Sequence, residues 1–220
     1  FHYFELAANQ FHPDALYYLG MFYYEGTYIQ MDKIKGFQCF LKSSNKRNIQ
    51  AHFAVGFLYH EGKCTQRNMK ESIHYYNEAS SFNNQFAKNN LGIIYKNGNG
   101  DEVKKNINKS IEYFKEAIKN KNDEVSMYNL ATIYMFDDTI QSNIDQSIDL
   151  LIQSAYLNFQ PSFALLCLAL VKKNKANFDN IRKEIHSKAK FNSEQFEDLI
   201  CEMIKNFQFD NPTAFEKNYQ

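Results

Sequence analysis

Residues 87–98 read AKNNLGIIYKNG, and residues 15–26 and 51–62 carry the same pattern as ALYYLGMFYYEG and AHFAVGFLYHEG. Each copy begins 36 residues after the one before, and Ala, Gly, Tyr and a final Gly occupy the same four places in all three. Recurrence at a fixed period of this length is typical of a stack of small structural units that pack on their neighbours, and not of one globular core. We therefore expect a repeat protein.

A second series predicts a second helix in each repeat. Small residues recur, and each is followed after three and four positions by a bulky pair such as Tyr75 and Tyr76. These small residues are Gly36, Ser72, Ser110 and Ser147. Four positions before each stands an Asp or Asn, whose side-chain oxygen suits the free N–H groups of a first helical turn. The expected N-caps are Asp32, Asn68, Asn106 and Asn143. Apolar and small residues at three and four spacing predict that the first stretch is helical too.

The two glycine series of the first helix have different expected roles. Gly26 and its two equivalents stand where that helix should end, and glycine accepts the left-handed conformation of a helix terminus without a Cβ clash. Gly20 and its two equivalents stand in mid-helix, where glycine costs stability. We interpret this second series as packing notches that let a neighbouring helix approach closely.

The pattern Ala-x-x-x-Leu-Gly-x-x-Tyr-x-x-Gly, followed by a polar loop and a second helix, resembles the Sel1-like repeat, a relative of the tetratricopeptide hairpin. The residues that carry the resemblance are Ala15, Leu19, Gly20, Tyr23 and Gly26, then Ala51, Gly56, Tyr59 and Gly62, then Ala87, Leu91, Gly92, Tyr95, Gly98 and Gly100. The resemblance implies an all-α fold, a right-handed superhelix (solenoid) of stacked antiparallel helix pairs. The fourth unit departs from the pattern, because Ala131 and Asp137 stand where glycines are expected.

The same pattern gives the expected domain organisation. Residues 1–12 are interpreted as the end of a preceding repeat. The repeats are placed at residues 13–50, 51–86, 87–125 and 126–161, with a degenerate helix at 162–172. Residues 173–220 leave the pattern, and we expect helices at 177–190 and 194–207 that cap the stack, followed by a tail. The alternative role for these helices is docking to another domain or subunit.

Composition narrows the classes of partner. The 25 basic and 25 acidic residues balance, so no net field attracts nucleic acid or an anionic membrane. The longest apolar run, 163–171, is too short to insert across a bilayer. The four cysteines occupy different places in the repeats, which favours free thiols, a reducing compartment and a cytoplasmic location. Because Phe1 falls inside an apparent second helix, we expect a fragment, which leaves a separate targeting segment open.

No catalytic or cofactor-binding motif was found. The sequence has no phosphate-binding glycine loop, no zinc-spaced cluster and no nucleophile motif, so neither a cofactor nor catalysis is expected. The nearest approach to a metal site is His52, His60, Cys64 and His74. Metal binding requires three or four converging ligands, so polar decoration of helices is the preferred interpretation.

Binding is therefore expected on a surface that the stack creates. Matching the glycines to tetratricopeptide-type helices, as the resemblance implies, places one face of each first helix on the concave side. These expected partner-binding residues are Tyr17, Met21, Tyr24, Phe53, Phe57, His60, Asn89, Ile93 and Lys96, continued in the fourth repeat by Tyr128, Thr132, Met135 and Phe136. Clusters of exposed aromatic and Met side chains are typical of peptide or helix recognition. The alternative is that the stripe is core.

The functional hypothesis is a non-catalytic adaptor or scaffold that holds a peptide, a helix or a protein domain on its concave face. An alternative is the regulatory or targeting region of a larger enzyme, for example a kinase. Partners are expected to be proteins or peptides, without nucleic acid or membrane insertion, and end-to-end self-association through the N-terminal edge is a further expectation.

Overall fold

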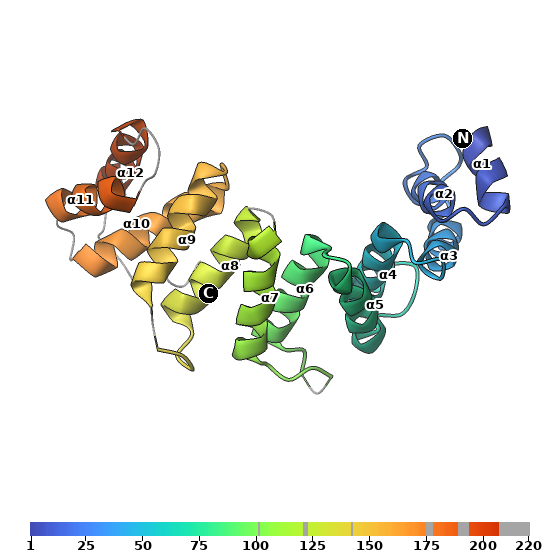
Figure 1. The fold of residues 1–220 in the computed structure, drawn as a ribbon, viewed down its shortest axis with the longest axis horizontal. Coiled ribbons are helices and arrows are strands. Elements are labelled where there is room, and N and C mark those ends of the chain that lie inside the picture. Colours follow the sequence, from blue (N-terminus) through green and yellow to red (C-terminus); the bar gives the residue numbers. More distant parts are fainter. Residues whose placement is uncertain (101, 121–122, 142, 175–177, 189–193, 207–220) are drawn as a thin grey trace. The chain divides into compact units, whose positions relative to one another are not determined.

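The computed structural model describes residues 1–100, 102–120, 123–141, 143–174, 178–188 and 194–206. Helices dominate these ranges, in which Asn99 and Val103 form an isolated bridge and no strand is found (Figure 1). The helices are α1 (His2–Asn9), α2 (Pro13–Glu25), α3 (Lys33–Ser44), α4 (Ile49–Glu61), α5 (Met69–Ser81), α6 (Gln85–Asn97), α7 (Ile107–Asn120), α8 (Glu124–Phe136), α9 (Ile144–Tyr156), α10 (Gln160–Asn174), α11 (Phe178–Lys188) and α12 (Glu194–Asn206). The all-α prediction is confirmed.

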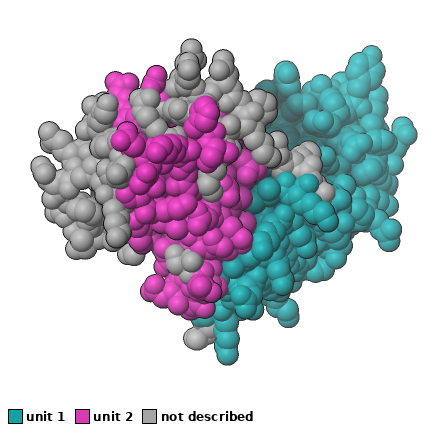
Figure 2. Space-filling view, turned by 60° about the vertical axis from the view of Figure 1, so that its left-hand side comes forward, with its two compact units in different colours: residues 1–126 teal, residues 127–220 magenta. Residues whose placement is uncertain are grey.

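The chain divides into two compact units, residues 1–126 and residues 127–220 (Figure 2). In the first unit, each helix from α1 to α7 packs against the next one along the chain. In the second unit, α9 packs on α10, and α10 packs on both α11 and α12. This neighbour-to-neighbour packing is that of a solenoid.

The two helices of a repeat run antiparallel, as their contacts in the first repeat show. The start of α2 meets the end of α3, because Ser43 Oγ donates to the Pro13 carbonyl at 2.7 Å. The end of α2 meets the start of α3, where the Asp32 N–H donates to the Tyr23 carbonyl at 2.8 Å. Between them, Gly20 faces the ring of Phe40.

The expected N-caps of the second helices are all present. The side chain of Asp32 accepts from the N–H three residues on at 3.0 Å, and the three asparagines do the same at 3.0 to 3.1 Å. Each cap also donates its own N–H to the carbonyl of the repeated tyrosine in the preceding helix, a link that the sequence did not predict. These pairs are Asp32 with Tyr23, Asn68 with Tyr59, Asn106 with Tyr95 and Asn143 with Tyr134. Each cap residue is therefore bonded to both helices that its loop connects, to the first through its N–H and to the second through its side chain.

The first helices begin earlier than the sequence suggested. Asn48 and Asn84 cap α4 and α6, so these helices start at Ile49 and Gln85, two residues before the repeated alanines. The side chain of Asn48 also donates to Asp14 Oδ1 at 2.7 Å and so joins the starts of two successive first helices.

The mid-helix glycines are packing notches, as predicted. A Cβ on Gly20 would lie 2.7 Å from the ring of Phe40, and a Cβ on Gly92 would lie 2.6 Å from the ring of Phe114. Gly56 stands in the same relation to Tyr76, at 2.8 Å. Any side chain at these places would displace a buried ring, so glycine's cost in helix stability is offset by close packing.

The helix-terminal glycines follow the prediction in two repeats of three. Gly26 and Gly62 adopt the left-handed conformation, with φ of 73° and 67°. Gly98 also has a positive φ of 70°, but its ψ of −177° is extended. The chain therefore leaves α6 in an extended direction, and not through the left-handed turn of Gly26 and Gly62. The following loop is longer here and contains the Asn99–Val103 bridge, which requires an extended departure from α6.

The second unit has a continuous apolar core to which both C-terminal helices contribute. Its buried members include Ile148, Leu151, Leu165, Leu166, Leu170, Ile181, Ile185, Ile200 and Ile204. The helices expected after residue 173 are thus present as α11 and α12, but their predicted stripe is not fully buried. Leu199 is 44% exposed, and Phe207 lies outside the described residues, as does the tail.

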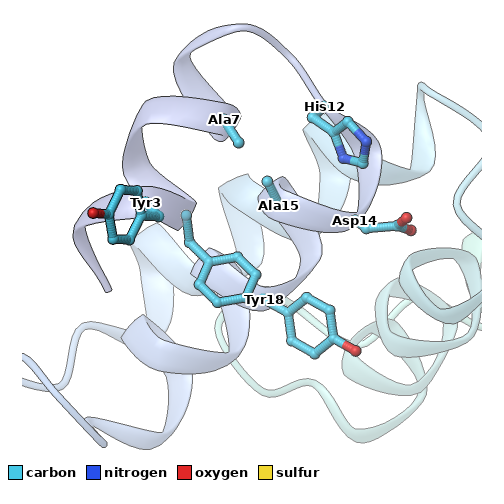
Figure 3. A pocket seen from close by; sticks show the side chains of 7 residues that line it. Tyr3, Ala7, His12, Asp14, Ala15 and Tyr18 are labelled. Atoms are coloured by element: carbon cyan, nitrogen blue, oxygen red, sulfur yellow. The ribbon is translucent and has the colours of Figure 1, made fainter.

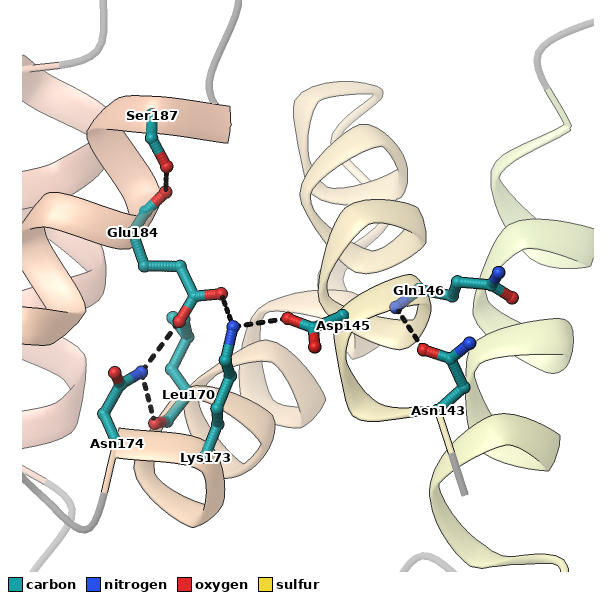
Figure 4. Close-up of polar contacts among 8 residues, drawn as sticks. All are labelled: Asn143, Asp145, Gln146, Leu170, Lys173, Asn174, Glu184 and Ser187. Atoms are coloured by element: carbon teal, nitrogen blue, oxygen red, sulfur yellow. Dashed lines mark hydrogen bonds and ion pairs between the residues drawn. The ribbon is translucent and has the colours of Figure 1, made fainter. Parts of the chain in front are cut away.

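Polar side chains join α9, α10 and α11 beside this core (Figure 4). The Lys173 ammonium of α10 donates to Asp145 of α9 and to Glu184 of α11. Asn174 Nδ2 donates to the same Glu184 carboxylate at 2.9 Å and to the Leu170 carbonyl at 3.0 Å. The hydrogen bond to Asp145, followed by that to Glu184, raises the pKa of Lys173. The Glu184 side chain, which is only 9% exposed, is thus paired with a cation, and this offsets the cost of removing its charge from water.

Candidate functional site

The nine residues predicted to bind a partner lie on the first helices of three repeats. Within α2, α4 and α6 they follow one another after four and then three residues, so each trio lies along one helix face. None of them is buried, and Phe57 is 36% exposed. The trios are Tyr17, Met21 and Tyr24, then Phe53, Phe57 and His60, then Asn89, Ile93 and Lys96. We call the two trios on α2 and α4 the aromatic face, which consists of Tyr17, Met21, Tyr24, Phe53, Phe57 and His60.

On α2, the aromatic face rests on a buried ring of the second helix. The rings of Tyr17 and Tyr24 lie 5.6 Å and 6.3 Å from Phe40, which is 1% exposed. Burial raises the pKa of the Tyr17 hydroxyl, with smaller contributions from Tyr18 and Glu25. These tyrosines are therefore held against the core while part of each remains accessible, so they are partly core and partly surface.

On α4, the arrangement repeats with Tyr76 as the supporting ring. Phe53 lies 5.8 Å from Tyr76, and His60 lies 6.3 Å from it, edge to face. The Lys63 ammonium lies 5.3 Å from the ring centre of Phe57, within the range of a cation–π contact. Each half-exposed aromatic residue thus has a partner that fixes its orientation.

The α6 trio is different in character. The Asn89 side chain accepts a hydrogen bond from Ser126 Oγ at 3.1 Å, and Ile93 and Lys96 are half-buried. No aromatic side chain belongs to this trio, so the apolar character of the predicted surface is concentrated on α2 and α4.

The predicted continuation in the fourth repeat is wrong at two of its four residues. Thr132 and Met135 of α8 are each only 6% exposed, whereas Tyr128 and Phe136 are half-buried. Met135 belongs to the apolar core of the second unit together with Ala131 and Leu151. Ala131 stands where the other repeats have glycine, so the alignment used for the first three repeats does not transfer to this helix.

Two exposed aromatic residues beside the aromatic face were missed. Phe86 is 59% exposed and its ring lies 5.9 Å from Phe53, while Tyr18 is 47% exposed and lies 5.5 Å from Tyr17. The sequence contains a signal for Phe86. The equivalent residues of the two preceding repeats, Asp14 and Gln50, are polar, so an aromatic residue at this place departs from the repeat pattern.

Two histidines of the second repeat have altered acidities. Burial lowers the pKa of both His52 and His60, and nearby Glu78 and Glu61 oppose that effect in each case. His52 is 8% exposed, and its Nδ1 atom has no hydrogen-bond partner among the described residues. The folded protein therefore favours the neutral form of His52.

This predicts a pH dependence of stability. The unfolded chain takes up the His52 proton near the ordinary pKa of 6.5, before the folded chain does. The contribution of neutral His52 to the free energy of unfolding is therefore fully present above pH 6.5. It is lost as the pH falls from 6.5 toward the lower pKa that His52 has in the folded protein. Urea denaturation from about pH 7.5 to about pH 5.5 should show a larger fall in unfolding free energy for the parent than for His52→Gln. Equal falls would contradict the prediction, and His2→Gln, at an exposed histidine of α1, is the control.

The cysteines and histidines form no evident metal centre in the part of the chain that the structure describes, where no group of three or more His, Cys, Asp or Glu residues is placed to hold an ion. Cys39, Cys64, Cys167 and Cys201 are free thiols, as expected. Burial raises the pKa of Cys167 to about 12, which keeps this thiol protonated and unreactive. Within the same described residues, no helix is long and apolar enough to cross a membrane.

Comparison with known proteins accounts for the repeat pattern. The profile of the Sel1 repeat matches residues 1–10, 13–48, 49–81, 85–122 and 125–159. The chain belongs to the Sel1 repeat family. Sel1 repeat proteins generally mediate protein–protein interactions and are typically scaffolds without catalytic activity. None of the curated proteins matches the chain in sequence.

Two solved structures show the same fold as this Sel1 repeat chain. A Sel1 repeat protein from Oxalobacter formigenes has a TM-score of 0.70 at 19% identity, over 85% of this chain and 78% of that one. The protein c5321, a protective antigen of uropathogenic Escherichia coli strains with an SLR fold, has a TM-score of 0.72 at 16% identity. That match covers 97% of this chain and 46% of c5321, so the chain spans less than half of this relative.

Proposed function

We propose that this Sel1 repeat chain is a non-catalytic adaptor that binds a peptide or helix of a partner protein on the aromatic face of α2 and α4. The observation that carries the proposal is the set of half-exposed aromatic and Met side chains at equivalent places of two successive repeats. Tyr and other aromatic residues dominate the binding energy of protein interfaces, because they bury a large area with few rotatable bonds.

The support beneath the face favours recognition with little rearrangement. Phe40 and Tyr76 are almost fully buried, and each lies between a glycine notch and the half-exposed aromatic side chains above it. A surface whose side chains are already oriented loses less conformational entropy on binding. The face is thus suited to an extended peptide or an amphipathic helix that supplies apolar anchors.

The test is selection of binding peptides from a displayed random library, followed by affinity measurement with variants. The Tyr24→Ala/Phe57→Ala double variant should bind the selected peptides at least about tenfold more weakly, since it removes two aromatic anchors. Phe82→Ala is a matched control, because Phe82 is 47% exposed and follows α5, a second helix, whereas the aromatic face lies on first helices.

Circular dichroism must show equal helicity for the parent and both variants. Peptides that bind the double variant and the parent equally would place the binding site elsewhere on the chain. Failure of the library to yield any specific binder would remove the support for a peptide-binding face altogether.

A further inference from the structure

The dipeptide Asn-Gly occurs twice in succession where α6 ends, at residues 97–98 and 99–100, and nowhere else in the chain. An asparagine followed by glycine can lose its side-chain amide by an internal reaction, in which the backbone nitrogen of the glycine attacks Cγ of the asparagine. Glycine permits this attack because it has no side chain to obstruct it. The two pairs have the same chemistry, so the structure around each of them decides which one reacts.

The first pair is held in an unreactive conformation. Asn97 is the last residue of α6, and the Gly98 N–H donates to the Ile94 carbonyl at 2.9 Å. Attack requires the glycine nitrogen to turn toward Cγ of the asparagine, whereas the hydrogen bond and the helical backbone hold it in place. The backbone of Val103 and Lys105 also lies against Gly98, since a Cβ there would be 3.0 Å from an atom of each. The first pair is therefore restrained on all these sides.

The second pair lacks these restraints. Asn99 stands beyond the helix, where its N–H donates to the Val103 carbonyl at 2.8 Å and its carbonyl accepts from the Glu102 N–H at 3.2 Å. The Gly100 N–H donates no backbone hydrogen bond to any residue that the structure describes. Gly100 is exposed, and a Cβ on it would have no atom within 4 Å. The attacking nitrogen of this pair thus has open space around it.

The amide that would react joins two successive repeats. Arg67 Nη2 of the second repeat donates to Asn99 Oδ1 at 3.2 Å, and Asn99 Nδ2 donates to a carboxylate oxygen of Glu102 at 2.6 Å. Arg67 Nε also donates to the His60 carbonyl at 3.1 Å. Both hydrogen bonds of the amide are exposed, so water can replace them and they restrain its rotation only weakly.

An amide that joins the first two repeats provides a contrast. Asn48 Nδ2 donates at 2.7 Å to Asp14, a residue that lines the pocket drawn in Figure 3. Asn48 Oδ1 accepts from the Ala51 N–H at 2.8 Å, and the residue is 7% exposed. Asn48 is followed by the β-branched Ile49, which obstructs attack by the backbone nitrogen. This amide is therefore protected, whereas that of Asn99 is not.

We propose that Asn99 is a site of spontaneous deamidation, and that in the folded protein it reacts in preference to Asn97. The Gly100 nitrogen forms a bond to Asn99 Cγ, the Cγ–Nδ2 bond breaks, and ammonia leaves with the proton of the Gly100 N–H. Water then adds across one of the two C–N bonds of the resulting cyclic imide and gives aspartate or isoaspartate. The reaction needs only water, and it does not depend on the function proposed for the aromatic face.

Either product changes the connection between the repeats. A carboxylate at position 99 can still accept from Arg67, but it has no donor for Glu102 and repels that carboxylate. Isoaspartate also lengthens the backbone by a carbon atom, which disturbs the bridge between residues 99 and 103. The converted chain carries an additional negative charge, and this makes the reaction measurable on the intact protein.

The test follows the folded chain in mildly alkaline buffer, in which the Gly100 nitrogen loses its proton more readily. Isoelectric focusing should reveal an acidic species that grows with time, and fragmentation in a mass spectrometer should place the changed mass at residue 99. Asn99 should be converted at least about tenfold faster than Asn97, because reaction at Asn97 first requires the end of α6 to open. The peptide of residues 95–105, YKNGNGDEVKK, is the reference without a fold and should lose both amides at comparable rates.

Two matched variants assign the acidic species to its residue. Asn99→Gln keeps an amide at this place, but glutamine must close a larger ring, so this chain should lose most of the acidic species. Asn97→Gln, at an exposed residue two positions away, should retain it. Circular dichroism must show equal helicity for the parent and both variants.

Three results would overturn the proposal. One is equal conversion of Asn97 and Asn99 in the folded chain, and another is an undiminished acidic species in Asn99→Gln. The third is an unchanged parent chain over a time in which the peptide is converted, which would show that Arg67 and Glu102 protect the amide.

Discussion

Replacing Gly92 with leucine should lower the free energy of unfolding by about 3 kcal/mol or more. A Cβ alone at this place would lie 2.6 Å from the ring of Phe114, and that ring is 0% exposed, so it has no free space into which to move. The gain in helix propensity is about 1 kcal/mol and does not offset overpacking of this size. Urea denaturation followed by circular dichroism measures the difference.

The control for Gly92→Leu is Gly100→Leu. A Cβ on Gly100 would have no atom within 4 Å, although its φ of 56° is unfavourable for a side chain. That backbone strain alone should cost about 1 kcal/mol. If the two substitutions cost the same, the packing notch is not what requires glycine at position 92.

Removing the ring that fills the first notch should be similarly costly. Phe40→Ala should lower the free energy of unfolding by roughly 3 to 5 kcal/mol, because the ring is 1% exposed and its loss leaves a cavity beside Gly20. The same substitution should weaken peptide binding to the aromatic face, since Tyr17 and Tyr24 rest on this ring.

Phe82→Ala provides the comparison for Phe40→Ala. Phe82 is 47% exposed, so its truncation should change the unfolding free energy by no more than about 0.5 kcal/mol. Thermal or urea unfolding of both variants and of the parent measures the two changes in unfolding free energy. Comparable losses at the two positions would mean that burial in the notch contributes little to stability.

Periodic features of the sequence predicted the fold well because each has a local physical cause. The caps at Asp32 and Asn68 and the notch glycines could be read from one repeat and checked against the next. The sequence could not show that Asn48 starts α4 while also bonding Asp14, because that contact joins residues 34 positions apart. The general fold thus follows from local pattern, whereas its connections require three-dimensional packing.

The candidate surface was less predictable for the same reason. An aromatic residue in a helix stripe is compatible with a core and with a groove, and Tyr17 is half-buried, packing on Phe40 while part of its side chain stays exposed. The face was predicted by assuming that every repeat keeps one alignment, which failed at Thr132 and Met135 of α8, the helix in which Ala131 replaces the notch glycine.

The hydrogen bonds that close each interhelical loop separate the length of that loop from the packing of the helices. Tyr23 and Asp32 are nine positions apart, as are Tyr59 and Asn68, whereas Tyr95 and Asn106 are eleven apart, yet the same N–H to carbonyl bond joins each pair. Two extra residues are thus confined to the segment outside the bond. Evolution can lengthen or rewrite these loops repeat by repeat, as an antibody varies its loops on a fixed framework, while the helices beneath keep their places.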